Sequence, residues 1–449
     1  MELSDPHGSS GLSQAELDAY WMPFTGNRQF KSDPRIFTEA HGCFYRDAAG
    51  RSIFDGLSGL WTCGLGHGRE EIATAVAQQL RTLDFAPPFQ FGHRGAFQLA
   101  HRITEHMPAG LDRVFFVGSG SEATDTALKM ARAYWRLRGQ ASKTRLIGRA
   151  RGYHGVNFGG ISVGGMVGNR KLYGEGVAAD HLPHTVLPEN AFSRGMPAVG
   201  AHLADALLEL IALHDASTIA AVIVEPFCGS AGVLPPPIGY LQRVREICDQ
   251  HQILLIFDEV ISGFGRSGAW TGAEAFGVKP DLLNFAKQVT NGAIPMGGVV
   301  TTDAIYQAFL AAGGPSYAIE FPHGYTYSAH PVACAAGLAA IDLLEREDAP
   351  ARVRALAPVL EAAVHQLRGA PHVSDIRNIG LAAGITLAHY PGEPARRPFE
   401  VAMACWRKGF YVRFGVDTVQ LAPPFVSTPA QIDALVSALG DALHEAATA

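Results

Sequence analysis

Short apolar runs alternate with amphipathic segments through the middle of the chain. The amphipathic segments have the periodicity of helices, as at 70–83, 121–138 and 239–250. The apolar runs are too short for helices and have no polar alternation, so we expect strands at 114–117, 145–148, 219–224, 253–257, 282–286 and 297–301. Strands that are apolar on both faces are typical of a parallel sheet covered by helices. The pattern therefore predicts an α/β fold with a mainly parallel sheet flanked by helices.

The last part of the chain has a different pattern. An Ala- and Leu-rich region over 335–368 predicts helix, and a further helix is expected to end at Lys408-Gly409. Apolar and alternating segments predict strands at 373–376, 384–387, 410–414 and 419–421, the last two as a hairpin. This order of elements predicts a second, smaller α+β domain.

The N-terminal segment contributes a short helix and a hairpin. Ser13 and Glu16 have the spacing of a capping box, which begins a helix. The alternation over 42–55 predicts a β-hairpin, which we expect to pack on the C-terminal domain. Because 449 residues are too many for one core, we expect two domains. We place the N-terminal segment of the small domain at 1–70, the large domain at 71–334 and the rest of the small domain at 335–449.

The composition indicates which kinds of partner and which cellular compartment to expect for the protein. The net charge of −6 argues against nucleic acid and anionic membranes, which favour basic surfaces. The six cysteines have no CxxC spacing and no accompanying His cluster, so we expect reduced thiols and no metal site. The polar, acidic start is unlike a signal peptide, and no apolar run reaches the roughly 18 residues of a membrane helix. We expect a cytoplasmic protein.

A lysine and an aspartate carry the main chemical prediction. Asp258 directly follows the apolar strand at 253–257, and Lys287 follows the strand at 282–286. A lysine amine can form a Schiff base with pyridoxal 5′-phosphate (PLP). A carboxylate can keep the pyridine nitrogen of PLP protonated, so that the ring withdraws electrons. The pair predicts a PLP site at the carboxyl edge of the sheet, where open α/β folds bind ligands.

The segment Gly118–Glu122 lies between an expected strand and the helix at 121–138. Glycines allow the backbone to approach an anion closely, and the N-terminus of a helix offers free N–H groups to a phosphate. Such a turn is equally compatible with an ordinary strand–helix connection when considered alone. The segment lacks the GK[ST] ending of a P-loop and the third glycine of a dinucleotide-binding turn. Together with Lys287 and Asp258, it predicts the phosphate site.

Three further residues lie at predicted strand ends. Tyr153 stands between glycines after the strand at 145–148 and could stack on a flat cofactor, although turn tyrosines are also common on surfaces. Glu225 follows the strand at 219–224 and is expected to orient the site, or to act as a helix cap or ion-pair partner. A single loop histidine is most often a hydrogen-bonding residue, so His154 receives no catalytic role.

Together these residues resemble the class III, fold-type I PLP-dependent aminotransferases, and most of all the ω-amino acid:pyruvate or β-alanine:pyruvate aminotransferases (ω-transaminases). The resemblance covers the chain from about residue 20 onward. It rests on the segments 21–25, 59–61, 83–89, 152–155, 257–266, 286–287 and 324–331. It implies a large PLP-binding domain with a mainly parallel sheet, and a smaller domain built from the N- and C-terminal segments.

The resemblance also implies roles for individual residues. Lys287 would be the Schiff-base lysine, Asp258 the partner of the pyridine nitrogen, and Tyr153 the residue stacked on the ring. The expected PLP-binding residues are Ser119, Gly120, Ser121, Tyr153, His154, Glu225, Asp258, Val260, Lys287 and, from the partner subunit of a homodimer, Thr326. The expected substrate-binding residues are Phe24, Leu60, Trp61, Phe89, Tyr153, Val156, Ser230, Ile261 and Arg413. Arg413 matches a mobile arginine that binds the substrate carboxylate, although an arginine on a solvated strand is equally common. The homodimer would share its active sites and could pair into a tetramer.

The chain departs from the family pattern at three places. Val117-Gly118 stands where Thr-Asn is frequent, Ala123 where a serine is usual, and Gln288-Val289 where Gly-Leu usually follows the lysine. These changes are expected to affect the affinity for PLP. Gln288 is also expected to reshape the wall of the active site beside Lys287.

The hypothesis for function is an ω-aminotransferase that moves an amino group from an ω-amino acid such as β-alanine, or from an amine, to pyruvate. It would give alanine and an aldehyde or keto product by a ping-pong mechanism through pyridoxamine phosphate. The alternatives are another class III PLP reaction (aminomutase, racemase or decarboxylase), a nucleotide-binding enzyme that uses the Gly118–Gly120 turn, and a non-catalytic protein with the same fold.

Overall fold

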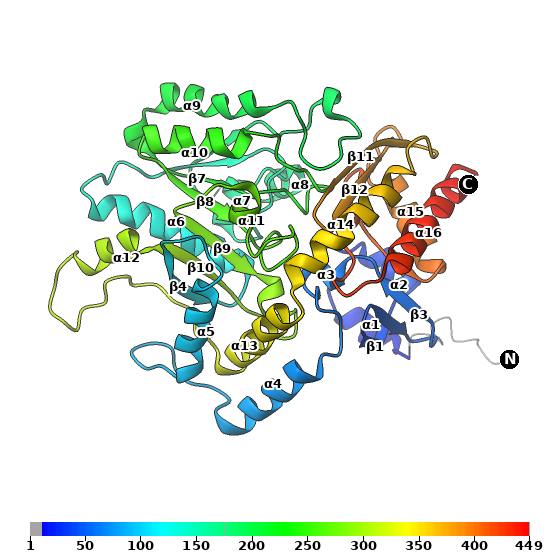
Figure 1. Cartoon of the computed structure of the whole chain (residues 1–449), viewed down its shortest axis with the longest axis horizontal. Coiled ribbons are helices and arrows are strands. Elements are labelled where there is room, and N and C mark those ends of the chain that lie inside the picture. Colours follow the sequence, from blue (N-terminus) through cyan, green and yellow to red (C-terminus); the bar gives the residue numbers. More distant parts are fainter. Residues whose placement is uncertain (1–10, 175, 449) are drawn as a thin grey trace.

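A seven-stranded sheet forms the centre of the computed structural model, which describes residues 11–174 and 176–448 (Figure 1). In sheet order its strands are β4 (Leu111–Val117), β10 (Gly297–Thr302), β9 (Leu282–Ala286), β8 (Leu254–Asp258), β7 (Ile219–Val224), β5 (Arg145–Arg149) and β6 (Ala179–Leu182). The strands from β9 to β6 pair in parallel, whereas β10 is antiparallel to both β9 and β4. The link from β9 to β10 is too short for a helical crossover, which explains the reversed strand. The predicted α/β fold class is confirmed.

Helices cover both faces of this sheet, and the strands are buried between them. Ile223 of β7 packs on one face with α6 (Gly120–Leu137). Its neighbour Val222 packs on the other face with α9 (Ala206–His214) and α10 (Tyr240–Gln250), which lie together at the top of Figure 1. Because successive side chains of a strand point to opposite faces, all six residues of β7 are buried. The other α-helices between residues 70 and 346 are α4 (Glu70–Thr82), α5 (Arg94–Thr104), α7 (Phe158–Val163), α8 (Val167–Tyr173), α11 (Gly272–Phe276), α12 (Asp303–Leu310) and α13 (Pro331–Arg346).

Two four-stranded sheets are built from the terminal segments. The first has the order β1 (Phe37–His41), β2 (Phe44–Asp47), β3 (Ser52–Asp55), β13 (Phe410–Tyr411). The second has the order β11 (Val373–Ile379), β12 (Ala382–Leu387), β15 (Thr418–Leu421), β14 (Arg413–Gly415). The helices of these segments are α1 (Gln14–Ala19), α2 (Asn27–Ser32), α3 (Ser58–Trp61), α14 (Ala349–His365), α15 (Arg396–Arg407) and α16 (Pro429–Thr448). Since β13 pairs in parallel with β3, the two ends of the chain share a sheet. The exact domain limits stay predictions.

The elements differ from the expected pattern in two places. The run 410–414 is not one strand: Phe410–Tyr411 pairs with β3, and Arg413–Gly415 pairs with β15. The helical region 335–368 is two helices, because Asp348 has a left-handed φ of 45° and caps α14 through the Ala351 N–H. The capping box at Ser13 is confirmed, since the Ser13 hydroxyl accepts the Glu16 N–H and Glu16 accepts the Ser13 N–H.

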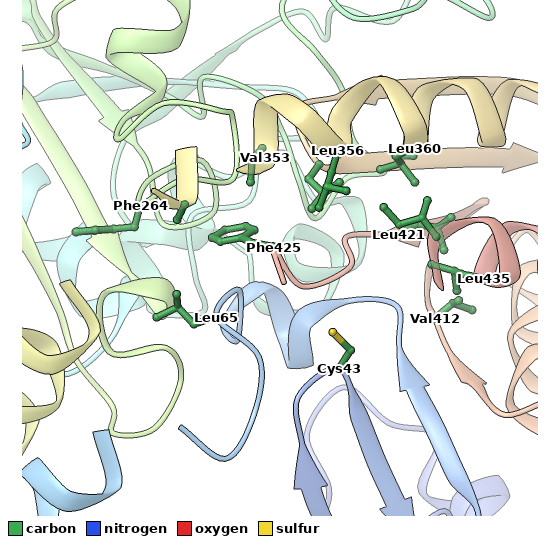
Figure 2. Close-up of a cluster of buried hydrophobic side chains, with 14 of the residues drawn as sticks. Cys43, Leu65, Phe264, Val353, Leu356, Leu360, Val412, Leu421, Phe425 and Leu435 are labelled. Carbon is green, nitrogen blue, oxygen red and sulfur yellow. The ribbon is translucent and has the colours of Figure 1, made fainter. Parts of the chain in front are cut away.

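A continuous apolar cluster joins the large sheet to the terminal segments. In Figure 2, Phe425 lies beside Val353, with Phe264 and Leu65 close by, and the cluster extends to Leu435 of α16. This core fixes the terminal segments against the large sheet. Within the described residues, no helix combines the length and the apolar character that crossing a bilayer requires.

Candidate active site

A cavity of about 180 Å³ opens at the carboxyl ends of the parallel strands. Five segments reach it: the N-terminus of α6, the turn after β5, and the residues that follow β7, β8 and β9. Its lining residues are Gly120, Ser121, Tyr153, His154, Gly155, Glu225, Asp258, Val260, Ile261, Ala286 and Lys287. The cavity thus lies where a doubly wound sheet holds its ligands.

The N-terminus of α6 forms part of the cavity wall through Gly120 and Ser121. The Ser119 hydroxyl caps the helix by accepting the Glu122 N–H at 3.2 Å, and Ser119 itself does not line the cavity. The first N–H groups of a helix have no intrahelical partner and carry a partial positive charge, which favours an anion beside Gly120 and Ser121. A Cβ on Gly155 would collide with Ser121, so only glycine allows the turn after β5 to come this close.

Asp258 and His154 form a buried pair. His154 Nδ1 and Asp258 Oδ2 are 2.8 Å apart, and both side chains are almost fully buried. Asp258 Oδ1 also accepts the Val260 N–H at 3.2 Å. His154 Nε2 has no hydrogen-bond partner within the described part of the chain. The histidine therefore fixes the direction of the carboxylate, a link that the sequence analysis missed.

Glu225 orients the segment that carries Tyr153. One carboxylate oxygen accepts the Tyr153 N–H at 3.0 Å, and the other accepts the Gly229 N–H at 3.2 Å. Burial raises the pKa of Glu225, although the neighbouring His154 and Arg149 oppose this effect. Glu225 thus ties the Tyr153 backbone to the end of β7.

Lys287 begins the turn that follows β9 and has a left-handed φ of 51°, which is uncommon for a residue with a Cβ. Removal from water lowers the pKa of its amine to about 8. Asp258 and Glu225 counteract this shift, and the positive charge of Arg413 adds to it. At neutral pH the amine is therefore much closer to losing its proton than an exposed lysine.

The expected substrate-binding residues are divided between the cavity and the surface. Ile261 lines the cavity, whereas Trp61 is 3% exposed and packs in a core cluster with Ile261 and Phe257. Arg413 and Ser230 are half-buried beyond the lining residues. Exposed on the single chain are Phe24, Leu60, Phe89 and Val156. Thr326, which was expected to reach the phosphate from the partner subunit, is exposed as well. A single chain therefore brings together the expected cofactor groups other than Ser119 and Thr326, but not the expected pocket for substrate.

Gln288 does not reshape the cavity wall, contrary to expectation. Its Oε1 accepts the Gly64 N–H at 2.7 Å, and its Nε2 donates to Asn291 Oδ1 at 3.2 Å. Asn291 Oδ1 also accepts the Leu65 N–H at 3.0 Å. The side chain thus turns away from the cavity and joins the Lys287 turn to the segment 64–65.

Replacing Gln288 by alanine is expected to lower the free energy of unfolding by about 1–3 kcal/mol, because a buried N–H loses its acceptor. The kcat should stay within about threefold of the native value, since the side chain does not line the cavity. Urea denaturation and steady-state kinetics test both expectations, with the exposed Gln250→Ala as control. A large loss of kcat at unchanged stability would contradict the structural role.

The groups around the cavity fit PLP. A lysine amine with a lowered pKa, a buried carboxylate and a helix N-terminus with a hydroxyl all line the same cavity. Lys287 could bind an aldehyde carbon, Asp258 a protonated ring nitrogen, and Gly120 and Ser121 a phosphate. Tyr153 could cover the ring.

Comparison with known proteins agrees with this chemistry. The family model described as "Aminotransferase class-III" matches residues 26–443. The β-alanine–pyruvate aminotransferase of Pseudomonas aeruginosa is 59% identical over 96% of this chain and 97% of its own length. The ω-amino acid–pyruvate aminotransferase of Pseudomonas putida is 60% identical over 98% of both chains.

Solved structures show the same fold. An amine transaminase from an uncultivated Pseudomonas species, in its PLP-bound form, has a TM-score of 0.88 at 35% identity, over 97% of this chain and 99% of that one. An (S)-enantioselective ω-transaminase from Thermomicrobium roseum has a TM-score of 0.89 at 33% identity, with the same coverage.

Proposed function

The chain belongs to the class III aminotransferases, and from this we propose that it is a PLP-dependent ω-aminotransferase that uses pyruvate as amino acceptor. The donor is β-alanine, another ω-amino acid or an amine, and the products are alanine and an aldehyde or keto compound. The names of the two Pseudomonas relatives support this pair of substrates. The observation that carries the proposal is the presence of the Lys287 amine and the Asp258 carboxylate around one cavity.

PLP, when bound, supplies a protonated ring that withdraws electrons from the carbon bearing the amino group. Asp258 would hold the proton on the ring nitrogen, and His154 would keep the carboxylate in place. The N-terminus of α6 and Ser121 would bind the phosphate. Tyr153, fixed through its backbone by Glu225, would cover the ring.

Lys287 is suited to move a proton within the site. A pKa of about 8 lies near the pH at which the enzyme would work, so the same amine can accept a proton and return it. This ability distinguishes amino transfer from loss of a carboxyl group, in which a different bond to the same carbon breaks.

Arg413 is proposed to bind the carboxylate of the substrate. It lies close enough to contribute to the lowered pKa of Lys287 and to counteract the raised pKa of Tyr153. Among the described residues, no carboxylate lies within ion-pair distance of Arg413. Its guanidinium can therefore hold a carboxylate through two parallel hydrogen bonds.

Replacing Arg413 by alanine is expected to raise the KM for pyruvate by about 10–100-fold, because hydrogen bonds to a charged group are lost. The KM for an amine donor without a carboxylate should change far less. Steady-state kinetics with both substrates measures the difference. The Arg413→Lys variant keeps the positive charge but cannot form two parallel hydrogen bonds, so its KM for pyruvate should lie between those of the native protein and Arg413→Ala. An equal rise in KM for pyruvate and for the uncharged amine would count against the assigned role.

We propose that the protein acts as a homodimer with shared active sites, or as a tetramer of two such dimers. Large apolar side chains that are exposed on the single chain support an interface; among them are Phe24, Phe89, Phe91 and Phe97. The partner subunit's Thr326 would complete the phosphate site. Six free cysteines support a reducing, cytoplasmic location.

Incubation of the purified protein with PLP, β-alanine and pyruvate tests the proposal, with alanine measured by chromatography. Alanine should form only when both substrates and PLP are present. Conversion of an amine without any keto acid would instead favour a racemase, decarboxylase or aminomutase.

A further inference from the structure

A fully buried arginine lies where the large sheet meets the terminal segments. Arg266 is 2% exposed and ends the loop after β8, the same loop whose Val260 and Ile261 line the cavity. Its guanidinium carbon lies over the ring of Phe425, 4.5 Å from the ring centroid. Figure 2 shows Phe425 in the apolar cluster that joins these parts of the chain. The arginine thus lies at the junction that fixes the terminal segments.

The guanidinium of Arg266 holds three segments that are far apart in the sequence. Nη1 donates to the Leu381 carbonyl at 3.1 Å, in the turn before β12, and to the Pro423 carbonyl at 2.8 Å, just after β15. Nη2 donates to the Ser58 hydroxyl at 2.8 Å, at the start of α3. Because the donors of a guanidinium lie in one rigid plane, the three bonds fix the angles between the segments as well as the distances.

The three acceptors of Arg266 are neutral oxygens, so burial of its charge is costly. Removal from water lowers the pKa of Arg266, and the nearby Asp55 opposes this effect. An arginine nevertheless keeps its charge at neutral pH. The cost of burying the charge is offset only when the hydrogen bonds keep a good geometry, and the three segments are therefore held closely in place.

The backbone of α3 has a conformation that its neighbours must hold. Ser58 and Trp61 have left-handed φ values of 50° and 66°, which are uncommon for residues with a Cβ. Such conformations persist where the surrounding contacts fix them. The Ser58 hydroxyl accepts from Arg266 and donates to the Ala422 carbonyl at 2.7 Å. This hydroxyl therefore links the arginine to the strained segment.

The orientation of the Trp61 ring depends on the same arginine. Trp61 is buried in an apolar cluster with Ile261, and its Nε1 has no hydrogen-bond partner within residues 11–174 and 176–448. The guanidinium carbon of Arg266 lies over the Trp61 ring, 6.0 Å from its centroid, where a cation is attracted to an aromatic face. Because its N–H has no acceptor, the ring takes its orientation from the groups packed around it.

We propose that Arg266 is a positioning residue for the amine donor, because it fixes the α3 backbone and the Trp61 ring beside the loop that lines the cavity. Arg266 does not itself line the cavity, so it acts through Trp61 and Ile261. Displacement of these side chains changes the space that the donor enters, and small displacements have large effects on binding and rate. The effect on substrates rests on the proposed function, whereas the effect on Trp61 does not.

Lys143 provides a matched control, because it is also a buried cation that binds backbone carbonyls and lies over a tryptophan. Its Nζ donates to three carbonyls, those of Ala216, Ile219 and Gln252. The same Nζ lies 4.3 Å from the centroid of the Trp135 ring. These residues do not line the cavity. Lys143→Met should therefore weaken the fold without changing the active site.

The position of Trp61 is measured by fluorine NMR of the PLP-loaded protein labelled with fluorotryptophan, with each signal assigned from the corresponding Trp→Phe variant. In Arg266→Met the Trp61 signal should shift or broaden while the Trp135 signal stays unchanged, and Lys143→Met should give the reverse. Arg266→Lys, which keeps the charge with fewer donors, should have a smaller effect on Trp61. An unchanged Trp61 signal in Arg266→Met would overturn the proposal.

The Ser58→Ala variant keeps the proposal testable if Arg266→Met does not fold. It removes a single oxygen, which breaks the link from Arg266 to α3 and leaves the other two acceptors in place. The Trp61 signal should shift in this variant as well. A Ser58→Ala protein with the native Trp61 signal would refute the positioning of α3 by Arg266.

Steady-state formation of alanine measures the effect on the donor. Arg266→Met should raise the KM for β-alanine about tenfold or more, and Arg266→Lys should recover part of this loss. The absorbance band of bound PLP should keep its position, and Lys143→Met should keep the native KM. An unchanged KM in Arg266→Met, or an equal rise in Lys143→Met, would contradict the positioning role. If the native protein transfers no amino group but the Trp61 signal responds as expected, the proposed function fails and the placement of Trp61 by Arg266 stands.

Discussion

Replacing Lys287 by alanine is expected to reduce kcat for amino transfer by at least about 10³-fold, because the variant loses the amine that we propose as both the nucleophile and the carrier of the proton. The lowered pKa of about 8 shows that the cavity disfavours the charged amine, so its removal should not destabilise the fold. The thermal unfolding temperature of Lys287→Ala without PLP should therefore stay close to that of the native protein without PLP.

Steady-state formation of alanine measures the effect of Lys287→Ala, and the exposed Lys279→Ala is the matched control. The control should behave as native. A small primary amine such as methylamine, which can enter the space that alanine leaves, should restore part of the activity. Full turnover by Lys287→Ala would contradict a role for Lys287 in the mechanism.

Replacing Asp258 by asparagine is expected to lower kcat by about 10²–10³-fold. Asparagine keeps the shape and can still hydrogen-bond with His154, but it lacks the charge that would hold a proton on the ring nitrogen. The variant should therefore fold and retain its side-chain position while losing the electronic effect. Rapid-mixing kinetics of the amine and pyruvate half-reactions should show both to be slowed.

Glu259→Gln is the matched control for Asp258→Asn, because this buried carboxylate is the next residue in the chain. Glu259 faces the start of α11, where it accepts the Ala273 N–H at 2.8 Å and the Ser262 hydroxyl at 3.1 Å. Burial raises its pKa to about 7. Its loss should affect stability more than kcat. Similar losses of kcat in the two variants would mean that the charge of Asp258 has no special role.

The position of the site could be predicted because its carboxylates directly follow apolar strands. The runs before Glu225 and Asp258 are uniformly apolar, and parallel strands place such ends at one edge of the sheet. Lys287 follows a third strand in the same way. Apolar runs that end at polar residues thus made it possible to predict the position of both the sheet and the cavity.

The contacts across that edge could not be predicted from the sequence. The pair of His154 and Asp258 depends on β7 lying between β5 and β8, which is a property of strand order. A sequence clue existed, since His154 follows a strand as Asp258 does. The direction of Gln288 depends on Gly64, which is far away in the chain.

The terminal segments were harder to predict because short strands obtain their stability from their partners. Phe410–Tyr411 and Arg413–Gly415 form one run in the sequence but pair in two sheets, since β3 and β15 each leave an edge open. The periodicity within the run gives no indication of the division.

The absorbance of the PLP-loaded protein tests the central claim most directly. Addition of β-alanine alone should bleach the band of the bound cofactor, and subsequent addition of pyruvate should restore it with the formation of one equivalent of alanine. A band that neither β-alanine nor other ω-amino acids and amines bleach, in a protein that clearly retains PLP, would contradict the proposed amino transfer.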